Sequence, residues 1–402
     1  MDSIRWSSLP RDILTTIARR FNTDVDLLRF RAVCTAWRSA VLPRRRFSFP
    51  VKVPFPNACF DDLNPNSRPG YFALFQSTLY RLSPISDAHS PNGWLFKVIA
   101  TNKPNTFSLL NPLSSYKIKF VPECFPNRIN LLDYRISEIC KSYSLKFVDL
   151  EDPSEQSEFV RIRRVAVLSN YLTDDNFVVM LLLYGGSLEA WRCGEEKWTK
   201  IGGDDYQFDD VLCCEGKCYA VTFTGVVMVF DSELKPIDSI MNTFLCYNPR
   251  QQKLLLEFDG DLYLVDKTSD PDPEFDYDYY LDGYVVNENT INMPMKLSFY
   301  RMNKVDGDWN YVGRLGGRVF FLGDDVSFGI WEKDFDGCKG NCVYLTDECF
   351  VQIEEDGVCG VDTGVYDLND CKIVALAECL DYAKVFWPAP SWLTASTSSL
   401  QC

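Results

Sequence analysis

The chain is poor in histidine: His89 is the single one among 402 residues. Histidine is the side chain that most often moves protons at neutral pH, so a Ser-His or Cys-His pair would have to use it. His89 stands in a loop-like stretch, "SDAHSPNGW", with no Gly-x-Ser-x-Gly motif nearby. We interpret it as a surface-loop residue, and we expect no catalytic residue and no enzymatic activity in the chain.

Further absences narrow the class of protein. Neither Gly-x-x-x-x-Gly-Lys-Ser/Thr nor Gly-x-Gly-x-x-Gly occurs, so neither a phosphate cradle nor a cofactor is expected. The longest apolar run, residues 177–184, is far shorter than the ~20 residues of a membrane span. No apolar signal-peptide core follows the polar start, and no Asn-x-Ser/Thr sequon is present. These features favour a location in the cytoplasm and/or the nucleus, without a membrane partner.

Charge is spread unevenly along the chain, whose formal net charge is −15. The first 50 residues carry ten Arg and four Asp, whereas the other 352 carry 31 basic and 52 acidic residues. Because binding to phosphates needs a basic surface, this balance argues against nucleic acid as the main partner. The basic N-terminal segment suits an acidic protein partner, and a solvated helical surface would explain the same charge equally well.

Sixteen cysteines are scattered from Cys34 to Cys402, in spacings that do not match a small disulfide scaffold. Two groups of three, each with a Cys-x3-Cys spacing and no histidine, could meet in a zinc site if adjacent strands brought them together. We favour buried free thiols over a metal site. The residues in question are Cys213, Cys214, Cys218, Cys338, Cys342 and Cys349.

The first 43 residues have the pattern of three short helices. Apolar residues recur at steps of three and four within residues 9–21, which gives a first helix with one apolar stripe. Thr23 and Asp26 form a capping box for a second helix. A third helix is expected over residues 35–42, and Pro43 ends it. Three such helices bury little apolar surface, so the unit needs a partner or a neighbouring domain.

The character of the sequence changes at about residue 47. Five prolines within residues 50–69 exclude a helix and predict a linker or docking segment over residues 47–70. Beyond it, short apolar runs alternate with turn signals such as Asp259-Gly260. Strands are predicted at residues 71–75, 177–184, 211–221, 226–230, 253–258, 262–265, 295–302, 319–322, 342–345 and 372–375.

A β-propeller accommodates many short strands, because it closes on itself and hides its strand edges. At ~45–50 residues for each four-stranded blade, residues 71–393 have room for six or seven blades. A faint repeat supports this architecture: residues 188–201, "LEAWRCGEEKWTKI", align with residues 297–312, "LSFYRMNKVDGDWNYV". In both, a strand and a polar turn precede a Trp and a second strand. We therefore predict an α+β multidomain chain, in which a small three-helix unit precedes an all-β propeller.

Two segments stand outside this pattern. Residues 270–282, "DPDPEFDYDYYLD", form an acidic and aromatic insertion, which we interpret as a solvated loop in preference to a docking site for a basic partner. Residues 394–402 are rich in Ser and Thr and are expected to form a disordered tail.

The N-terminal segment resembles an F-box. That motif reads Leu-Pro, a helix with two or three aliphatic residues, Leu-Leu-Arg and Val-Cys-x-x-Trp-Arg, and residues 9–41 read "LPRDILTTIARRFNTDVDLLRFRAVCTAWRSAV". More than ten positions agree in register, while Arg19-Arg20 stand where many F-boxes have an aliphatic residue nearby. The resemblance implies a surface for a Skp-type adaptor made by Leu9, Pro10, Ile13, Leu14, Ile17, Leu27, Leu28, Val33, Cys34, Trp37 and Arg38.

The rest of the chain resembles the KIB-type β-propeller domain that commonly follows such an F-box in plants. Three stretches near the C-terminus carry this likeness: "GRLGGRVFFLGDDVSFGI", "GCKGNCVYLTDE" and "FWPAPSWL". Together the two resemblances cover most of the chain. They imply an F-box domain at residues 1–46, a linker or docking segment at 47–70, a propeller at 71–393 and a tail at 394–402.

What the resemblance implies is a non-catalytic, substrate-recognition subunit of an SCF-type ubiquitin ligase. The adaptor would link the F-box to a cullin and a RING subunit, and the propeller would select a protein substrate. Two alternatives stay open. One is an F-box scaffold that acts without ubiquitin delivery, and the other is a carbohydrate-binding or hydrolytic propeller, whose paired carboxylates the sequence does not locate.

Overall fold

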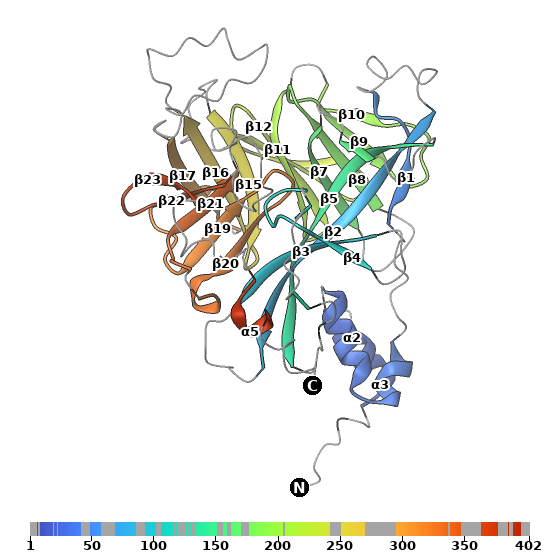
Figure 1. Cartoon of the computed structure of the whole chain (residues 1–402). Helices are drawn as coiled ribbons and strands as arrows, with labels where there is room; N and C mark the ends of the chain where they lie inside the picture. Colours follow the sequence, from blue (N-terminus) through green and yellow to red (C-terminus); the bar gives the residue numbers. More distant parts are fainter. Residues whose placement is uncertain are drawn as a thin grey trace.

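Figure 1 shows the chain as a computed structural model. Short helices at the N-terminus precede a domain built of strands, and a further short helix lies near the C-terminus. The structure describes residues 6, 9–18, 20–21, 23–41, 49–57, 69–85, 93–101, 106–115, 117–118, 125–126, 129, 133–150, 156–158, 162–169, 177–203, 206–241, 251–269, 295–304, 306–336, 338–346, 363–376, 385 and 389–394.

The N-terminal unit contains α1 (Arg11–Ala18), α2 (Asp24–Ala32) and α3 (Thr35–Ala40). The predicted cap of the second helix is confirmed, because the Thr23 hydroxyl accepts the backbone N–H of Asp26 at 3.2 Å. A buried cluster of Leu14, Ala18, Leu27, Phe30 and Ala40 holds the three helices together. The core is therefore small, as three short helices allow.

Residues 49–57 lie against the strands that follow. Strand β1 (Val51–Val53) pairs antiparallel with β2 (Gly70–Pro84), and the Phe55 ring packs edge-on against Phe72 at 5.3 Å between ring centroids. The Trp198 indole N–H donates to the Pro54 carbonyl oxygen at 2.9 Å. This part of the expected linker or docking segment is fastened to the propeller, while residues 58–68 lie outside the described residues.

The strands beyond β1 form five groups, here called the first to fifth blades. The first contains β2, β3 (Trp94–Ala100), β4 (Phe107–Leu110) and β5 (Tyr134–Asp149), with the short β6 (Gln156–Glu158) paired to β5. The second contains β7 (Ile162–Ser169), β8 (Phe177–Leu183), β9 (Leu188–Arg192) and β10 (Thr199–Ile201). These two blades share one sheet, since Tyr143 of β5 pairs with Val165 of β7.

The other three blades are separate sheets. The third contains β11 (Phe208–Cys214), β12 (Lys217–Thr222), β13 (Val226–Phe230) and β14 (Pro236–Met241). The fourth contains β15 (Gln251–Phe258), β16 (Asp261–Ser269), β17 (Met295–Met302) and β18 (Trp309–Val312). The fifth contains β19 (Arg318–Leu322), β20 (Ser327–Trp331), β21 (Cys342–Thr346), β22 (Thr363–Asp367) and β23 (Lys372–Ala375), with β19 and β21 parallel.

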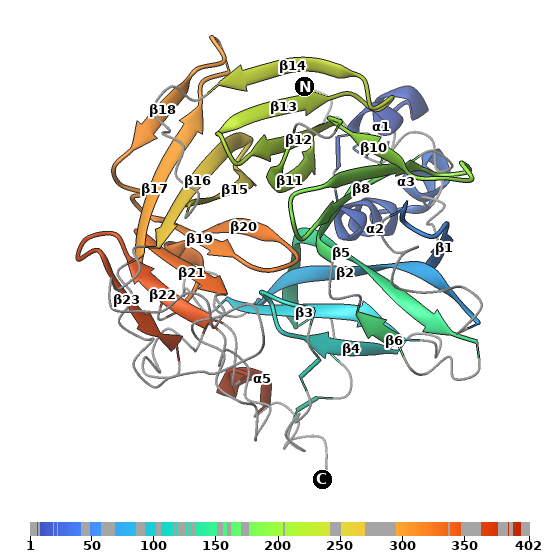
Figure 2. The same cartoon turned by 90° about the horizontal axis from the view of Figure 1, so that it is seen from above.

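Seen from above, the blades surround a common centre, so that the fifth lies beside the first (Figure 2). Each neighbouring pair shares a buried apolar cluster, and these clusters close the ring without strand pairing between the fifth and first blades. In order around the ring, the clusters include Phe147 with Trp191, Leu188 with Phe208, Val229 with Leu264, Leu256 with Phe320, and Phe321 with Leu95.

The prediction of an N-terminal helical unit and a following all-β propeller is confirmed, but the described strands form five blades and not the six or seven expected. The estimate assumed uniform blades, whereas the first blade with β6 extends from Gly70 to Glu158. It is long because β2 has 15 residues and β5 has 16, well above the ~5–6 of an ordinary strand. The acidic insertion at 270–282, His89 and residues 395–402 lie outside the described residues.

The predicted repeat is confirmed. Residues 188–201 form the outer hairpin β9–β10 of the second blade, and residues 297–312 form the equivalent hairpin β17–β18 of the fourth. Trp198 and Trp309, the matched residues, are both buried. Asp259-Gly260 makes the two-residue turn between β15 and β16, where both residues have positive φ, +55° and +78°.

Candidate functional site

The F-box helices bury one set of apolar side chains and expose another. Leu14 and Leu27 are buried in the helical core, and Leu9, Ile17 and Trp37 pack against it. The Trp37 ring lies 4.5 Å from the Phe30 ring between centroids, and its indole N–H donates to the Trp6 carbonyl oxygen at 3.0 Å. The F-box resemblance assigns these five residues to the adaptor surface. In the structure they hold the three helices together.

The exposed set is unusual for so small a unit. Ile13 on α1 is 45% exposed, Leu28 on α2 is 59% exposed, and Val33, directly after α2, is 57% exposed. Pro10 and Arg38 are exposed as well, and Cys34 is half-buried. We call Pro10, Ile13, Leu28 and Val33 the exposed apolar set. A contiguous exposed apolar patch on a helical surface marks a place where another protein packs.

Arg29 of α2 contacts the propeller instead of the helical core. Its guanidinium donates to the Ile136 carbonyl oxygen in β5 at 2.5 Å and to the Asp26 carboxylate at 3.3 Å. The residue belongs to the Leu-Leu-Arg part of the F-box pattern, but it was not among the predicted contact residues. The sequence contains no signal for this contact, because its two sides are 107 residues apart.

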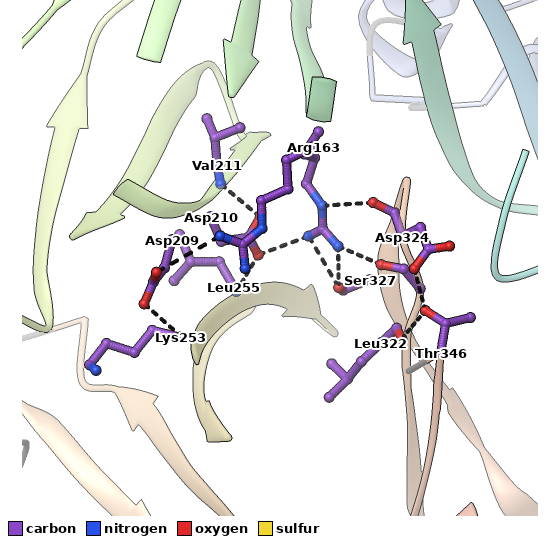
Figure 3. Close-up of polar contacts among 12 residues, drawn as sticks. Arg163, Asp209, Asp210, Val211, Lys253, Leu255, Leu322, Asp324, Ser327 and Thr346 are labelled. Carbon is purple, nitrogen blue, oxygen red and sulfur yellow. Dashed lines mark hydrogen bonds and ion pairs between the residues drawn. The ribbon is translucent and has the colours of Figure 1, made fainter. Parts of the chain in front are cut away.

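The second notable feature is a buried polar network at the centre of the propeller, to which several blades contribute (Figure 3). Arg164 on β7 lies 2.8 Å from the Asp210 carboxylate on β11. Its guanidinium also donates to the Gly323 carbonyl oxygen at 2.6 Å and to the Ser327 hydroxyl at 3.3 Å. Asp210 in turn accepts the backbone N–H of Leu255 on β15 at 2.8 Å. One guanidinium thus joins the second, third, fourth and fifth blades.

Burial raises the pKa of Asp210, and the Arg164 guanidinium and the N–H groups of Leu255 and Val211 oppose that increase. The next acid, Asp209, accepts the Lys253 backbone N–H at 3.0 Å and lies 3.9 Å from Arg163. Burial raises the pKa of Asp209 too. Figure 3 shows the Asp209 carboxylate turned toward Arg163, while Asp210 pairs with Arg164. Charged groups at this depth are stable only as paired groups.

The fifth blade meets the first through a second buried pair. Lys97 on β3 is fully buried, and its ammonium donates to the Asp325 carboxylate and to the Ser114 carbonyl oxygen. Asp325 lies in the loop between β19 and β20, two residues after Gly323. A Cβ at Gly323 would clash with the Leu113 carbonyl oxygen, so glycine lets this loop reach the centre. The loop therefore receives both the Arg164 and the Lys97 side chains.

The described cysteines divide into one disulfide-bonded pair and thiols outside any disulfide. Cys213 and Cys218 face each other across the β11–β12 hairpin and form a disulfide, which the sequence did not predict. Burial raises the pKa values of the Cys140, Cys214 and Cys338 thiols to about 12. Among the described residues, no group of three His, Cys, Asp or Glu side chains could hold a metal ion, and Cys349 lies outside them.

No helix in the described ranges is long and apolar enough to cross a membrane. The arrangement as a whole offers surfaces for binding: exposed aliphatic residues on the helices, and a rigid ring of blades whose charged centre is internally paired.

Comparison with known proteins assigns both parts of the chain. F-box protein SKIP23 and F-box protein At2g17036, both from Arabidopsis thaliana, are each 28% identical to it, covering 98% of this chain and 96% of their own lengths. Among solved structures, the N-terminal domain of Nup159 covers 73% of this chain and 77% of its own, at 10% identity. Its TM-score of 0.31 is too low to support a statement on fold or function. Residues 6–48 match the F-box domain and residues 72–367 match the KIB1-4 beta-propeller, so the chain belongs to the KIB1-4 beta-propeller family and carries an F-box domain ahead of its propeller.

Proposed function

We propose that the chain is the substrate-recognition subunit of an SCF-type ubiquitin ligase. The F-box binds a Skp-type adaptor, the adaptor connects it to a cullin and a RING subunit, and the propeller holds a protein target. F-box domains typically bind Skp-type adaptors, and F-box proteins with a β-propeller are generally substrate receptors of such ligases. We place this role in the cytoplasm and/or the nucleus.

The observation that carries the proposal is the exposed apolar set on the F-box helices. Leu28 and Val33 stand more than half exposed on a unit whose own core holds few buried side chains. Covering such side chains with a partner removes apolar surface from water, a gross gain of ~25 cal/mol for each Å² buried that offsets the entropic cost of association. The exposed Arg38 of α3 suits an acidic partner surface.

The proposed role of the propeller is binding without chemistry. It would raise the local concentration of a target near a cullin-bound conjugating enzyme. Ubiquitin transfer through a thioester needs an exposed thiolate, and burial raises the pKa values of three of the described thiols, Cys140, Cys214 and Cys338, to about 12. The names of the relatives are likewise those of F-box proteins and not of enzymes.

Assembly from purified components tests this proposal. We expect the full chain to co-elute with a Skp-type adaptor and a cullin on size-exclusion chromatography, and to enter the cullin complex only when the adaptor is present. Ile13→Asp combined with Val33→Asp should remove the chain from the complex, because a charge replaces the buried apolar contact.

The control variant is Tyr311→Asp, which places one such charge at a 63%-exposed aromatic residue of the fourth blade. It should co-elute like the wild-type chain. Association of the double variant at wild-type levels would contradict the proposed surface. A complex that contains adaptor but never cullin would favour the scaffold alternative over the ligase.

A further inference from the structure

The F-box and the propeller are joined by a short connection. The helical unit is described up to Val41, and the chain is fastened to the propeller again from Phe49, whose ring lies 6.0 Å from the Tyr143 ring. Seven residues lie between these points, and a chain of that length spans at most ~25 Å. This length limits how far the F-box can move from the propeller, but it does not set its direction.

A contact between α2 and the propeller sets the direction in which the F-box points. Arg29 donates to the Ile136 carbonyl oxygen near the start of β5, and the same guanidinium holds the Asp26 carboxylate one turn back on its own helix. Figures 1 and 2 both place α2 beside β5. The planar fork of an arginine can serve two acceptors at once, which the point charge of a lysine does less well. The tip of the side chain is thereby held through both terminal nitrogens, Nη1 at Asp26 and Nη2 at Ile136.

The strand that receives Arg29 is itself held firmly. Ile136 packs against a buried cluster that contains Leu82, Trp94 and Leu393, the last from the C-terminal helix α5 (Ser391–Thr394). The Trp392 ring of the same helix lies 5.6 Å from the Tyr134 ring between centroids. The start of β5 is therefore a fixed platform, to which the C-terminal end of the chain contributes.

The two sides of α2 have separate contacts. Leu28 and Arg29 are neighbours in sequence, so their side chains leave the helix about 100° apart. Leu28 is 59% exposed although Arg29 reaches the propeller, so the propeller does not cover Leu28. An adaptor on the Leu28 side can bind while Arg29 keeps its contact.

From this geometry we propose that Arg29 is an interdomain positioning residue, which fixes the orientation of the F-box relative to the propeller by anchoring α2 to the start of β5. The inference goes beyond the proposed function, because it concerns the free chain and requires no adaptor. In a ligase, the same anchor would set the direction in which a held target faces.

Single-molecule energy transfer in the full-length chain tests the proposal. Because the chain has sixteen cysteines, the dyes are attached to azide-bearing residues introduced at Ser39 on α3 and at Lys217 on the third blade, both exposed positions. The wild-type chain should give one narrow distance distribution. Arg29→Ala should broaden that distribution and shift its mean, and Arg29→Lys should broaden it as well.

The matched control is Arg20→Ala, which removes the same charge from another exposed position of the F-box and should leave the distribution unchanged. A wild-type distribution in Arg29→Ala, or a wild-type chain already as broad as that variant, overturns the proposal. If Arg29→Ala fails to fold, as judged by loss of helical circular dichroism, Arg29→Lys decides: a broadened distribution supports the anchor and an unchanged one overturns it. Adaptor binding is measured separately, so its failure would affect only the proposed function.

Discussion

The F-box and the propeller differ in what they bury: the described core of the F-box is apolar throughout, whereas the propeller also buries charged residues. The F-box exposes aliphatic residues such as Ile13 and Leu28, which folded domains usually bury. The propeller buries charged residues such as Lys97, Arg164 and Asp210, which folded domains usually expose. The exposed aliphatic residues and the buried charged residues are explained by the location of the groups that each kind of side chain contacts.

In the propeller the partners are internal. Arg164 finds Asp210, Gly323 and Ser327 on other blades, so the closed ring supplies every contact that the buried charge needs. In the F-box, the described residues of the three short helices leave Leu28 and Val33 more than half exposed. The propeller therefore pairs its buried charges within its own fold. The helical unit, as we propose, has its exposed apolar residues covered by a second protein.

The largest expected effect is in the propeller. Arg164→Met keeps much of the side-chain volume but leaves the Asp210 carboxylate buried without its cation. Breaking a buried pair in this way costs ~3–5 kcal/mol. We expect a decrease of that size in the unfolding free energy, measured by urea titration of the β-sheet circular dichroism signal.

The neighbouring arginine serves as the control for this prediction. Arg163 lies 3.9 Å from Asp209, and its side chain is 24% exposed, so water screens part of the interaction. Arg163→Met should cost ~1 kcal/mol or less. If the two variants lost the same unfolding free energy, the buried Arg164 pair would contribute no more to stability than a partly exposed ion pair.

A second prediction concerns the rate at which thiols react. Because the thiolate is the reactive form, and burial raises the pKa values of Cys214 and Cys338 to about 12, both thiols stay protonated at neutral pH. Relative to the usual value of ~8.5, their thiolate fraction is lower roughly thousandfold or more. Iodoacetamide at pH 7.5 should label the exposed Cys371 and spare these two, as read by peptide mass spectrometry.

Labelling of Cys214 and Cys338 should appear when the chain is unfolded in denaturant, which serves as the positive control. Fast labelling of either thiol in the folded chain would show that the propeller does not enclose it. It would also reopen the question of a reactive cysteine in the ligase subunit.

The smallest effect is expected at the helix cap of the F-box. Thr23→Ala removes the hydroxyl that accepts the Asp26 N–H, which costs ~1 kcal/mol of helix stability. The amides of α2 should therefore exchange with deuterium roughly fivefold faster, while amides of β8 stay protected. A change that spreads to β8 would contradict the separation of the two regions.

Local patterns in the sequence were enough to predict the elements whose causes are local. The Thr23 cap, the turn at Asp259-Gly260 and the repeat that matches Trp198 with Trp309 depend on residues close together in the chain. The F-box residues were located by their register, and the structure then divided them into an inner set around Leu14 and an outer set around Leu28. Helical periodicity alone does not separate these sets when the partner that would cover one of them is a different molecule.

Features that depend on distant parts of the chain could not be predicted. Arg164 meets Asp210 across 46 residues and Gly323 across 159, and nothing near any of the three signals the others. The five blades of the described strands, where six or seven were expected, have a similar reason, since β2 and β5 pair with each other along the whole first blade. The disulfide between Cys213 and Cys218 required the register of the β11–β12 hairpin.

The central claim is that the outer apolar residues of the F-box bind an adaptor while the inner ones hold its helices. Calorimetric titration of a Skp-type adaptor into the full-length chain, with Leu28→Asp and Leu14→Ala as a pair, tests it most directly. Leu28→Asp should weaken binding by ~2 kcal/mol or more and leave hydrogen exchange of α1 and α2 unchanged. Leu14→Ala should accelerate that exchange, because a ~2–5 kcal/mol core contact is lost. Wild-type adaptor affinity in Leu28→Asp would contradict the account.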